Sequence, residues 1–342
     1  MSLALIGITV LWTFLFGYMI VASIDFGAGF LHVYSELSGN RQVIRGVVER
    51  YLSPVWEVTN VFLVFFFVGI VGFFPKTAYY YGSALLIPAS ISIILLAIRG
   101  SYYAFHAYGG GNRYYTLLYG LTGLFIPASL SIVFPISEGG FMAVKDDGAD
   151  LLYGELLRSP YALSVVLLAI TSILFISATF LTFYAKAADD KKAEQLLRRY
   201  ALRWSLPTLL AALVTSYSLR LHNPEHFRRM TDSWWLFALS LLCFAGAVML
   251  LYRRERYGLA FFLVVLQFGL AFFGYGFSHY PYLLYPYLTI DDGFTNQAMA
   301  KALMISFVLG LFALIPALYL LLRLFLFDPE YVKGKKKGGH GS

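Results

Sequence analysis

The sequence has a single cysteine and few charged residues, and these two shortages exclude several classes of protein. Cys243 is the only cysteine among 342 residues, so the chain alone forms no internal disulfide, no cysteine zinc site and no iron–sulfur cluster. Only 13% of the residues are charged and 59% are hydrophobic, with a mean hydropathy of +0.69. Because a soluble domain carries about 25% charged residues, this composition indicates a polytopic membrane protein.

Several motifs are also missing. No Lys or Arg precedes the first apolar stretch, so we interpret that stretch as a first membrane span rather than a cleaved signal peptide. The glycine run at 109–111 lacks the Lys and Ser or Thr of a phosphate-binding loop. The sequence shows no hydrolase triad, zinc-binding helix or dinucleotide fingerprint, and we expect no metal site. The net charge of +7 comes from short loops between apolar runs, which favours membrane topology over nucleic-acid binding.

Apolar runs of about 20 residues recur throughout the chain, and each is long enough to cross a membrane as a helix. We therefore predict an all-α polytopic fold with nine transmembrane helices. Their expected ranges are 3–33, 55–74, 79–107, 114–136, 160–185, 202–222, 233–252, 257–280 and 302–326.

The loops predict the orientation of these spans. With nine spans, 18 Lys and Arg residues fall in loops on one side and 7 on the other. Because basic loops stay in the cytoplasm, we expect the N-terminus outside the cell and the C-terminus in the cytoplasm.

The two longest polar stretches suggest how the single transmembrane domain, 1–342, is divided. They are the outer loop 137–159 and the charged inner loop 186–201, which flank the fifth span. We expect a first group of four spans in 1–136, a second in 160–280, a lone helix at 302–326 and a basic cytoplasmic tail at 327–342.

Three ionisable residues lie within or at the edge of apolar spans: Asp25, Glu57 and Arg99. A charge inside a span costs several kcal/mol, so it usually faces a bundle interior, a partner or a water path. Asp25 lies about 22 residues into the first span, which is roughly 33 Å at 1.5 Å per residue. Arg99 lies similarly deep in the third span, and Glu57 opens the second from the cytoplasmic side. All three are therefore expected at one depth.

Two interpretations of this cluster stay open. In the functional one, Asp25 and Glu57 exchange protons on the cytoplasmic side while Arg99 adjusts their pKa values. In the structural one, Arg99 pairs with an acid and joins three helices, or all three side chains extend to interfacial water. The histidines nearest span ends, His32, His106, His222 and His279, are more typical of interfacial residues than of haem ligands.

The order of the polar motifs resembles one family, subunit II of the cytochrome bd quinol oxidases. The stretch SIDFGAGF matches the family's pattern at the end of its first span, PVWEVTN matches its second acidic motif, and an Arg-Gly pair matches its third. The matching residues are Asp25, Gly27, Gly29, Pro54, Trp56, Glu57, Asn60, Arg99 and Gly100. The family's usual Glu and Arg after the third motif are replaced by Ala104 and His106, which puts details of a polar path in doubt.

The resemblance implies two four-helix bundles and one peripheral helix, paired with a similarly folded subunit I. In the family, subunit I holds two b haems, haem d and the quinol-oxidising site, and the complex reduces oxygen to water with protons taken from the cytoplasm. Subunit II holds none of the haems, carries a structural quinone in some members, and in some complexes is joined by a small single-helix third subunit.

We therefore predict a non-haem subunit of a terminal oxidase, with Asp25, Glu57, Arg99, Trp56 and Asn60 along a proton pathway. The glycines 27, 29 and 100 would let neighbouring helices approach closely. A purely structural scaffold subunit and a proton-coupled transporter are the alternatives. The transporter would need broken helices around a central substrate site, whereas the charges here lie toward one face.

Overall fold

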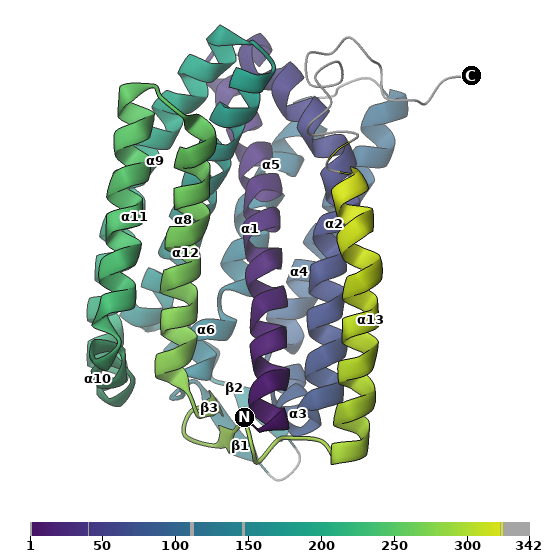
Figure 1. The fold of residues 1–342 in the computed structure, drawn as a ribbon, viewed down its shortest axis with the longest axis vertical. Coiled ribbons are helices and arrows are strands. Elements are labelled where there is room, and N and C mark those ends of the chain that lie inside the picture. The colour runs from purple at the N-terminus through teal and green to yellow at the C-terminus, as the bar shows by residue number, and fades with distance from the viewer. Residues whose placement is uncertain (1, 40, 110–112, 146–147, 322, 324–342) are drawn as a thin grey trace.

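The computed structural model consists almost entirely of helices, and it describes residues 2–39, 41–109, 113–145, 148–321 and 323 (Figure 1). Within these ranges no side chain is described at 41–42, 45, 49–58, 102–109, 113, 115, 144–145, 148, 318 and 321. The helices are α1 (Leu3–Leu37), α2 (Arg41–Phe73), α3 (Pro75–Ala84), α4 (Leu86–Gly109), α5 (Arg113–Leu130), α6 (Val133–Ser137), α7 (Tyr153–Arg158), α8 (Pro160–Ala187), α9 (Lys191–His222), α10 (Pro224–Asp232), α11 (Trp234–Arg253), α12 (Tyr257–His279) and α13 (Gln297–Leu321).

Helix starts follow local signals in the sequence. The Ser2 hydroxyl accepts a hydrogen bond from the Leu5 amide at 3.2 Å, and Asp190 caps α9 by accepting from the Ala193 amide at 3.0 Å. Ser159 caps α8, whose first residue is Pro160. A side-chain acceptor satisfies an amide that the helix leaves unpaired, and proline at the first position removes another such amide. The predicted spans at 3–33 and 160–185 begin at the observed helix starts, whereas α9 begins at Lys191, before the predicted span 202–222.

Among the described residues, six helices are long and apolar enough to cross a membrane, or seven if a bent pair counts as one span. The six lie in 3–37, 116–137, 160–187, 234–253, 257–279 and 297–317. The described apolar part of α4, Leu86–Ser101, is shorter, and α9 begins with a charged segment. The chain is therefore a helical multi-pass membrane protein, as predicted, and the count of nine spans stays a prediction.

The prediction of one span over 79–107 is wrong at its start. Residues Pro75–Ala84 form the separate helix α3, which is bent by 119° from the preceding apolar segment Thr59–Phe73. Phe74 has a non-helical backbone, and Pro75 follows it at the start of α3. The residue before a proline avoids helical geometry, so the chain turns at the predicted break between the second and third spans, and α3 then ends in a further turn at Leu85. The next helix, α4, then begins at Leu86.

The helix contacts centre on α1 and α8. Helix α1 packs on α2, α5 and α8, and α4 packs on α5; α8 in turn packs on α9 and α12, and α11 packs on α12. Helix α13 lies beside α2 at one side of the molecule (Figure 1). The predicted division into two four-helix groups stays a prediction.

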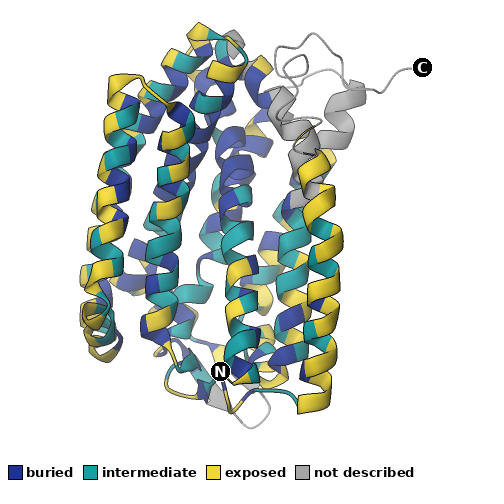
Figure 2. Cartoon of the chain, in the orientation of Figure 1, coloured by how far each residue is buried: buried dark blue, intermediate teal, exposed yellow. Residues whose placement is uncertain are grey.

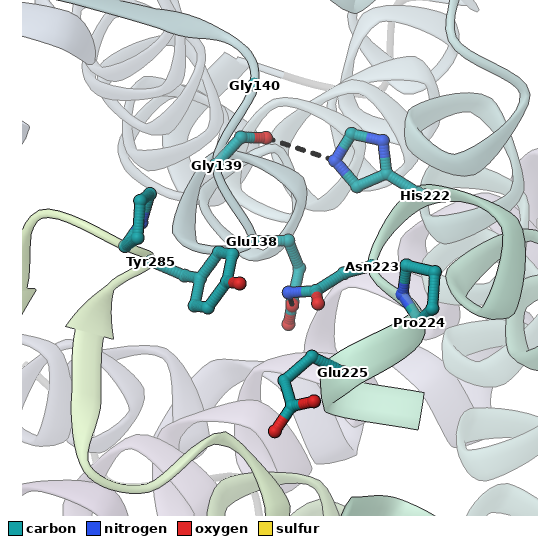
Figure 3. A pocket seen from close by; sticks show the side chains of 9 residues that line it. Glu138, Gly139, Gly140, His222, Asn223, Pro224, Glu225 and Tyr285 are labelled. Carbon is teal, nitrogen blue, oxygen red and sulfur yellow. Dashed lines mark hydrogen bonds between the residues drawn. The ribbon is translucent and has the colours of Figure 1, made fainter. Parts of the chain in front are cut away.

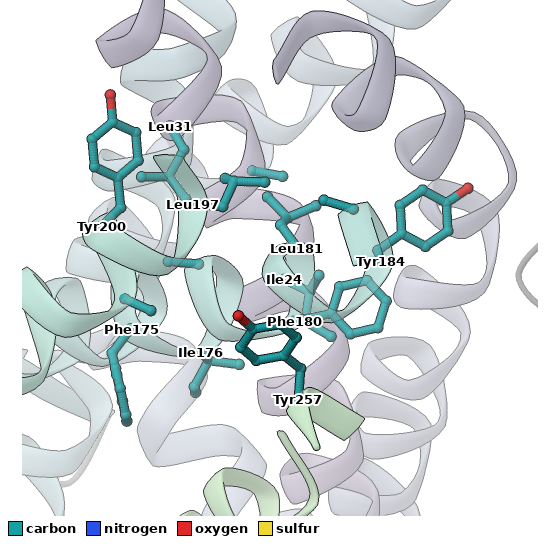
Figure 4. Close-up of a cluster of buried hydrophobic side chains, with 14 of the residues drawn as sticks. Ile24, Leu31, Phe175, Ile176, Phe180, Leu181, Tyr184, Leu197, Tyr200 and Tyr257 are labelled. Atoms are coloured by element: carbon teal, nitrogen blue, oxygen red, sulfur yellow. The ribbon is translucent and has the colours of Figure 1, made fainter. Parts of the chain in front are cut away.

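The largest apolar core cluster joins α1 to the later helices (Figure 4). Ile24 and Leu31 of α1 belong to it together with Phe175 and Leu181 of α8. The approach of α1 to α8 is close at Gly27, because a Cβ there would lie 2.7 Å from the Ile173 carbonyl oxygen. Glycine is required at this crossing, where backbone meets backbone.

The outward faces of α11 and α13 are exposed and apolar (Figure 2). Leu242 on α11 is 69% exposed and Phe312 on α13 is 74% exposed. Apolar exposure of this extent is unfavourable in water but suits the hydrocarbon of a bilayer.

Two small hairpins lie at the end of the bundle that holds the N-terminus, which we call the N-terminal face (Figure 1). Strands β1 (Met142–Lys145) and β2 (Gly148–Leu151) pair antiparallel, with Met142 opposite Leu151. Strands β3 (Tyr282–Leu284) and β4 (Leu288–Thr289) also pair antiparallel, with an irregular register. Helix α10 lies at the same face. The opposite end of the bundle is called the distal face below.

We predict that Gly27→Ala destabilises the protein, because the new methyl group would overlap the α8 backbone. The expected cost is about 1–3 kcal/mol, as for other overpacked sites, seen as a lower thermal unfolding midpoint in detergent. Gly82→Ala is the matched control, since a Cβ at Gly82 in α3 meets nothing within 4 Å. Equal midpoints for the two variants would contradict the close crossing of α1 and α8.

Candidate functional site

A buried ion pair joins α1 and α4 inside the bundle. The Arg99 guanidinium donates from Nε to Asp25 Oδ2 at 3.1 Å and from Nη2 to Asp25 Oδ1 at 3.1 Å. The Arg99 side chain is 0% exposed and that of Asp25 is 3% exposed. Two parallel hydrogen bonds from a planar guanidinium to a carboxylate give the strongest form of this pairing. The structure thus brings together two of the three predicted charged residues.

Arg99 has further acceptors that do not depend on the Asp25 carboxylate. It donates to the backbone oxygen of Asp25 at 2.6 Å, to that of Tyr119 at 2.9 Å and to the Tyr119 hydroxyl at 2.9 Å. It also donates to the Thr122 hydroxyl at 3.4 Å, and its guanidinium lies 3.9 Å from the centre of the Tyr119 ring. Arg99 of α4 therefore binds α1 and α5 at once.

Gly29 makes room for this guanidinium. A Cβ at Gly29 would lie 3.0 Å from both Arg99 Nη atoms and 2.8 Å from a ring carbon of Tyr119. A residue with a side chain would push the guanidinium away from α1. Gly100, the third glycine singled out in the sequence, follows Arg99 in α4 and is half-buried.

The remaining predicted pathway residues lie on α2. Its helical backbone includes Trp56, Glu57 and Asn60, and α2 packs on α1. The side chains of Trp56 and Glu57 lie outside the described part of the structure, as does that of His106. Asn60 is half-buried and His32 is buried. Whether Glu57 meets the Asp25–Arg99 pair stays a prediction.

A second polar cluster lies at the N-terminal face, and the sequence interpretation missed it. Glu138 follows α6, and its carboxylate oxygens both lie 2.8 Å from Nδ1 of His226 in α10. Nδ1 of His279, the last residue of α12, lies 3.3 Å from Glu138 Oε1. The Asn223 amide donates to Glu138 Oε2 at 2.9 Å, and the Tyr275 hydroxyl donates to Oε1. The side chains of Glu138 and His226 are 0% exposed.

The surroundings of Glu138 favour its charged form. Burial raises the pKa of the carboxyl group, but the hydrogen bonds from His226 and His279 and the charges of the two histidines lower it more. The net result is a pKa well below the usual range of a glutamate. Glu138 is therefore a carboxylate at every physiological pH, held away from water.

A cavity of about 240 Å³ opens beside this carboxylate (Figure 3). Glu138, His222, Asn223 and Glu225 line it, together with Tyr285 from the loop between β3 and β4. The His222 ring donates from Nε2 to the Gly139 carbonyl oxygen at 3.0 Å and stacks on Phe141. His222 is therefore turned away from the Glu138 carboxylate.

Sequence reasoning took His279 as an interfacial residue and did not single out Glu138 or His226. The three come from segments 53 to 141 positions apart in the chain, without a short motif that joins them. The one sequence signal for this cluster is Glu138 in the stretch PISEGGF. It lies between an apolar run and two glycines, so few polar side chains flank it. Its partners appear only when α10 and α12 fold against α6.

The fold and the ion pair define a class: a multi-pass helical membrane protein with an arginine and an aspartate buried in its bundle. The sequence of this chain matches the family of cytochrome bd terminal oxidase subunit II over residues 3–325. The chain therefore belongs to that family. It is a subunit of a quinol oxidase, an oxidoreductase complex of the respiratory chain, and its membership implies a partner oxidase subunit.

Two known proteins are similar over nearly the whole chain. The putative cytochrome bd menaquinol oxidase subunit II of Bacillus subtilis (strain 168) is 32% identical over 340 residues, which cover 96% of this chain and 97% of that protein. A chain of the bd oxidase structure from Geobacillus thermodenitrificans is 64% identical, with a TM-score of 0.83, and the match covers 96% of this chain and 100% of that one. The membership favours an oxidase role over a proton-coupled transporter.

We predict that Arg99→Gln is strongly destabilising, because it leaves the Asp25 carboxylate buried without its cation. Breaking a buried ion pair on one side costs about 3–5 kcal/mol, measured as a loss of thermal stability or of assembled protein. The double variant Asp25→Asn with Arg99→Gln removes both charges and is expected to recover part of that loss. A double variant whose loss of stability equals the summed losses of Asp25→Asn alone and Arg99→Gln alone would contradict a direct pairing.

Proposed function

We propose that this chain is the haem-free subunit of an oxygen-reducing quinol oxidase and that it supplies protons from the cytoplasm to the reaction. The two b haems, haem d and the quinol-oxidising site are assigned to the partner, subunit I. Electrons then reach oxygen without passing through this chain, whose part is proton transfer and support of the partner. We place the N-terminal face outside the cell and the distal face in the cytoplasm, as the basic loops favour.

The observation that carries the proton role is the independent anchoring of Arg99. Its guanidinium is held by two backbone oxygens and the Tyr119 hydroxyl besides the Asp25 carboxylate. When Asp25 takes up a proton, these bonds still hold Arg99 in place, so protonation does not require the helices to separate. The carboxylate can therefore be loaded and unloaded within a rigid site.

Protonation of Asp25 changes the net charge of the buried pair. The ionised pair has no net charge, whereas protonation of Asp25 leaves the fixed positive charge of Arg99 alone in the bundle. An uncompensated charge in a medium of low dielectric constant is costly, so the proposed path needs a group that takes the proton on from Asp25. The Tyr119 hydroxyl, which donates to Asp25 Oδ1 at 3.4 Å, is one group that can pass the proton on.

Glu57, Trp56 and Asn60 form the proposed approach to this pair. Glu57 would take protons from the cytoplasmic side and exchange them with Asp25, while Trp56 and Asn60 shape the path. The support for this step is that α2 packs on α1 and that Asn60 is half-buried on α2.

One observation favours a second candidate, a scaffold role. Arg99 donates hydrogen bonds to groups on both α1 and α5, and such a cluster also serves to hold helices in register. In that case the charges matter for assembly and stability, and the oxygen chemistry does not depend on protonation of Asp25.

Charge-neutral substitutions separate the two roles. We predict that Asp25→Asn and Glu57→Gln each slow oxygen reduction by the assembled complex at least about tenfold, a barrier increase of about 1.4 kcal/mol. Oxygen consumption and membrane potential in proteoliposomes are the measurements, with haem content as the check on assembly. Asp292→Asn, at an exposed carboxylate between β4 and α13, is the control and should keep the full rate. Fully active but less stable Asp25→Asn and Glu57→Gln complexes would establish the scaffold role instead.

The assignment of the haems to the partner is tested by spectroscopy. We expect the purified complex to show reduced b- and d-haem absorption bands, and this chain expressed and purified alone to show neither. Chemical haem extraction of the separated subunits gives the same comparison without relying on absorbance. Haem that copurifies with the isolated chain in a fixed ratio would overturn the assignment.

A further inference from the structure

The cluster at the N-terminal face has the donor set of a transition-metal site. Glu138, His226 and His279 each offer one ligand atom, and these atoms all lie within 4.8 Å of one another. They come from three separate elements, so the site forms only in the folded bundle. Two imidazoles and one carboxylate are the ligands that hold Zn²⁺ in sites with an open fourth position. None of the three residues belongs to the proposed proton pathway.

The tautomer of His226 prepares one nitrogen for a cation. The Ser278 hydroxyl lies 3.0 Å and 2.9 Å from the carbonyl oxygens of Gly274 and Tyr275, so its single proton is directed to them. Its oxygen is then an acceptor for His226 Nε2, 2.8 Å away. With Nε2 carrying a hydrogen, the lone pair of Nδ1 faces the Glu138 carboxylate, and a positive species has to lie between them.

The position of His279 adds a second nitrogen to the cluster. Its Nδ1 lies 3.3 Å from Glu138 Oε1, and its Nε2 lacks a hydrogen-bond partner within the described residues. A divalent ion accepts the lone pairs of both Nδ1 atoms and of the carboxylate together. It also compensates the buried negative charge with a bound cation.

Two of the three donors are held by hydrogen bonds to neighbouring groups. The Asn223 amide and the Tyr275 hydroxyl fix the Glu138 carboxylate, and Ser278 fixes His226 as described above. Hydrogen bonds of this kind orient metal ligands and set their tautomers. A cavity of about 240 Å³ borders Glu138 and Asn223 (Figure 3).

We propose that Glu138, His226 and His279 bind one divalent first-row transition-metal ion, with Zn²⁺ the best match to the donor set. Imidazole and carboxylate ligands favour such ions over Mg²⁺ or Ca²⁺, which prefer oxygen donors alone. Because the ligands follow α6, lie in α10 and end α12, the ion would tie these three helices together at the N-terminal face.

The test uses the intact oxidase complex, stripped with a chelator and dialysed against ZnCl₂. Zinc per complex is then measured by mass spectrometry across a range of free Zn²⁺. We expect one site in the wild type that is weakened at least about 10-fold in His226→Gln and His279→Gln, since loss of even a supporting group costs 10-fold or more. His222→Gln is the matched control, because His222 lines the same cavity but donates to Gly139, and it should bind as the wild type does.

Several outcomes would overturn the proposal. In one, the wild-type complex binds no more zinc than the His226→Gln complex. In another, the His222→Gln complex loses as much zinc as the His226→Gln complex. If the variants fail to assemble, zinc K-edge absorption of the loaded wild-type complex decides. Imidazole scattering with zinc–nitrogen distances of about 2.0–2.1 Å supports the site, and a shell of oxygen alone refutes it. None of these results depends on the proton role of Asp25.

Discussion

Arg99 is the largest fully buried side chain in the described part of the chain, and the first half of the bundle is organised around its charge. A guanidinium in the bundle needs a carboxylate and several oxygens within reach, since an uncompensated buried charge costs about 3–5 kcal/mol, a large part of the stability of a typical fold. Asp25 and the Tyr119 carbonyl meet this need from α1 and α5. Their positions fix the rotation and the depth of both helices relative to α4. Gly29 follows from the same constraint, because any side chain there would occupy the place of the guanidinium.

Among the described residues, the two buried acids are neutralised by different chemistry. Asp25 faces arginine, which stays protonated at any pH a cell experiences, so its partner is a permanent charge. Glu138 faces two histidines, whose ring nitrogens can also bind metals. A permanent cation such as Arg99 suits the proposed role of Asp25, whose carboxylate gains and loses protons. Two imidazoles suit the proposed role of Glu138, whose cluster binds and releases a metal ion.

The sequence predicted the membrane class because this class follows from hydropathy. It predicted one depth for Asp25 and Arg99 because depth follows from the constant rise per residue of a helix. It did not predict that α3 and α4 are separate helices, since the turn at Leu85 lies in the apolar stretch 84–87. It also missed Glu138 with His226, because residues near span ends are normally solvated. Only the packing of α10 and α12 against α6 removes that water, and such packing leaves no periodic signal in the sequence.

The separation of the paired charges along the chain also has a consequence for biosynthesis. Asp25 precedes Arg99 by 74 residues, and ribosomes add about 5–20 residues per second. The first helix is therefore made roughly 4–15 s before its cation exists. During that interval the insertion machinery has to accept an unpaired acid, either protonated or kept in contact with water. Release of α1 into lipid is thus tied to the arrival of α4, and the first four helices are best regarded as a unit that enters the membrane together.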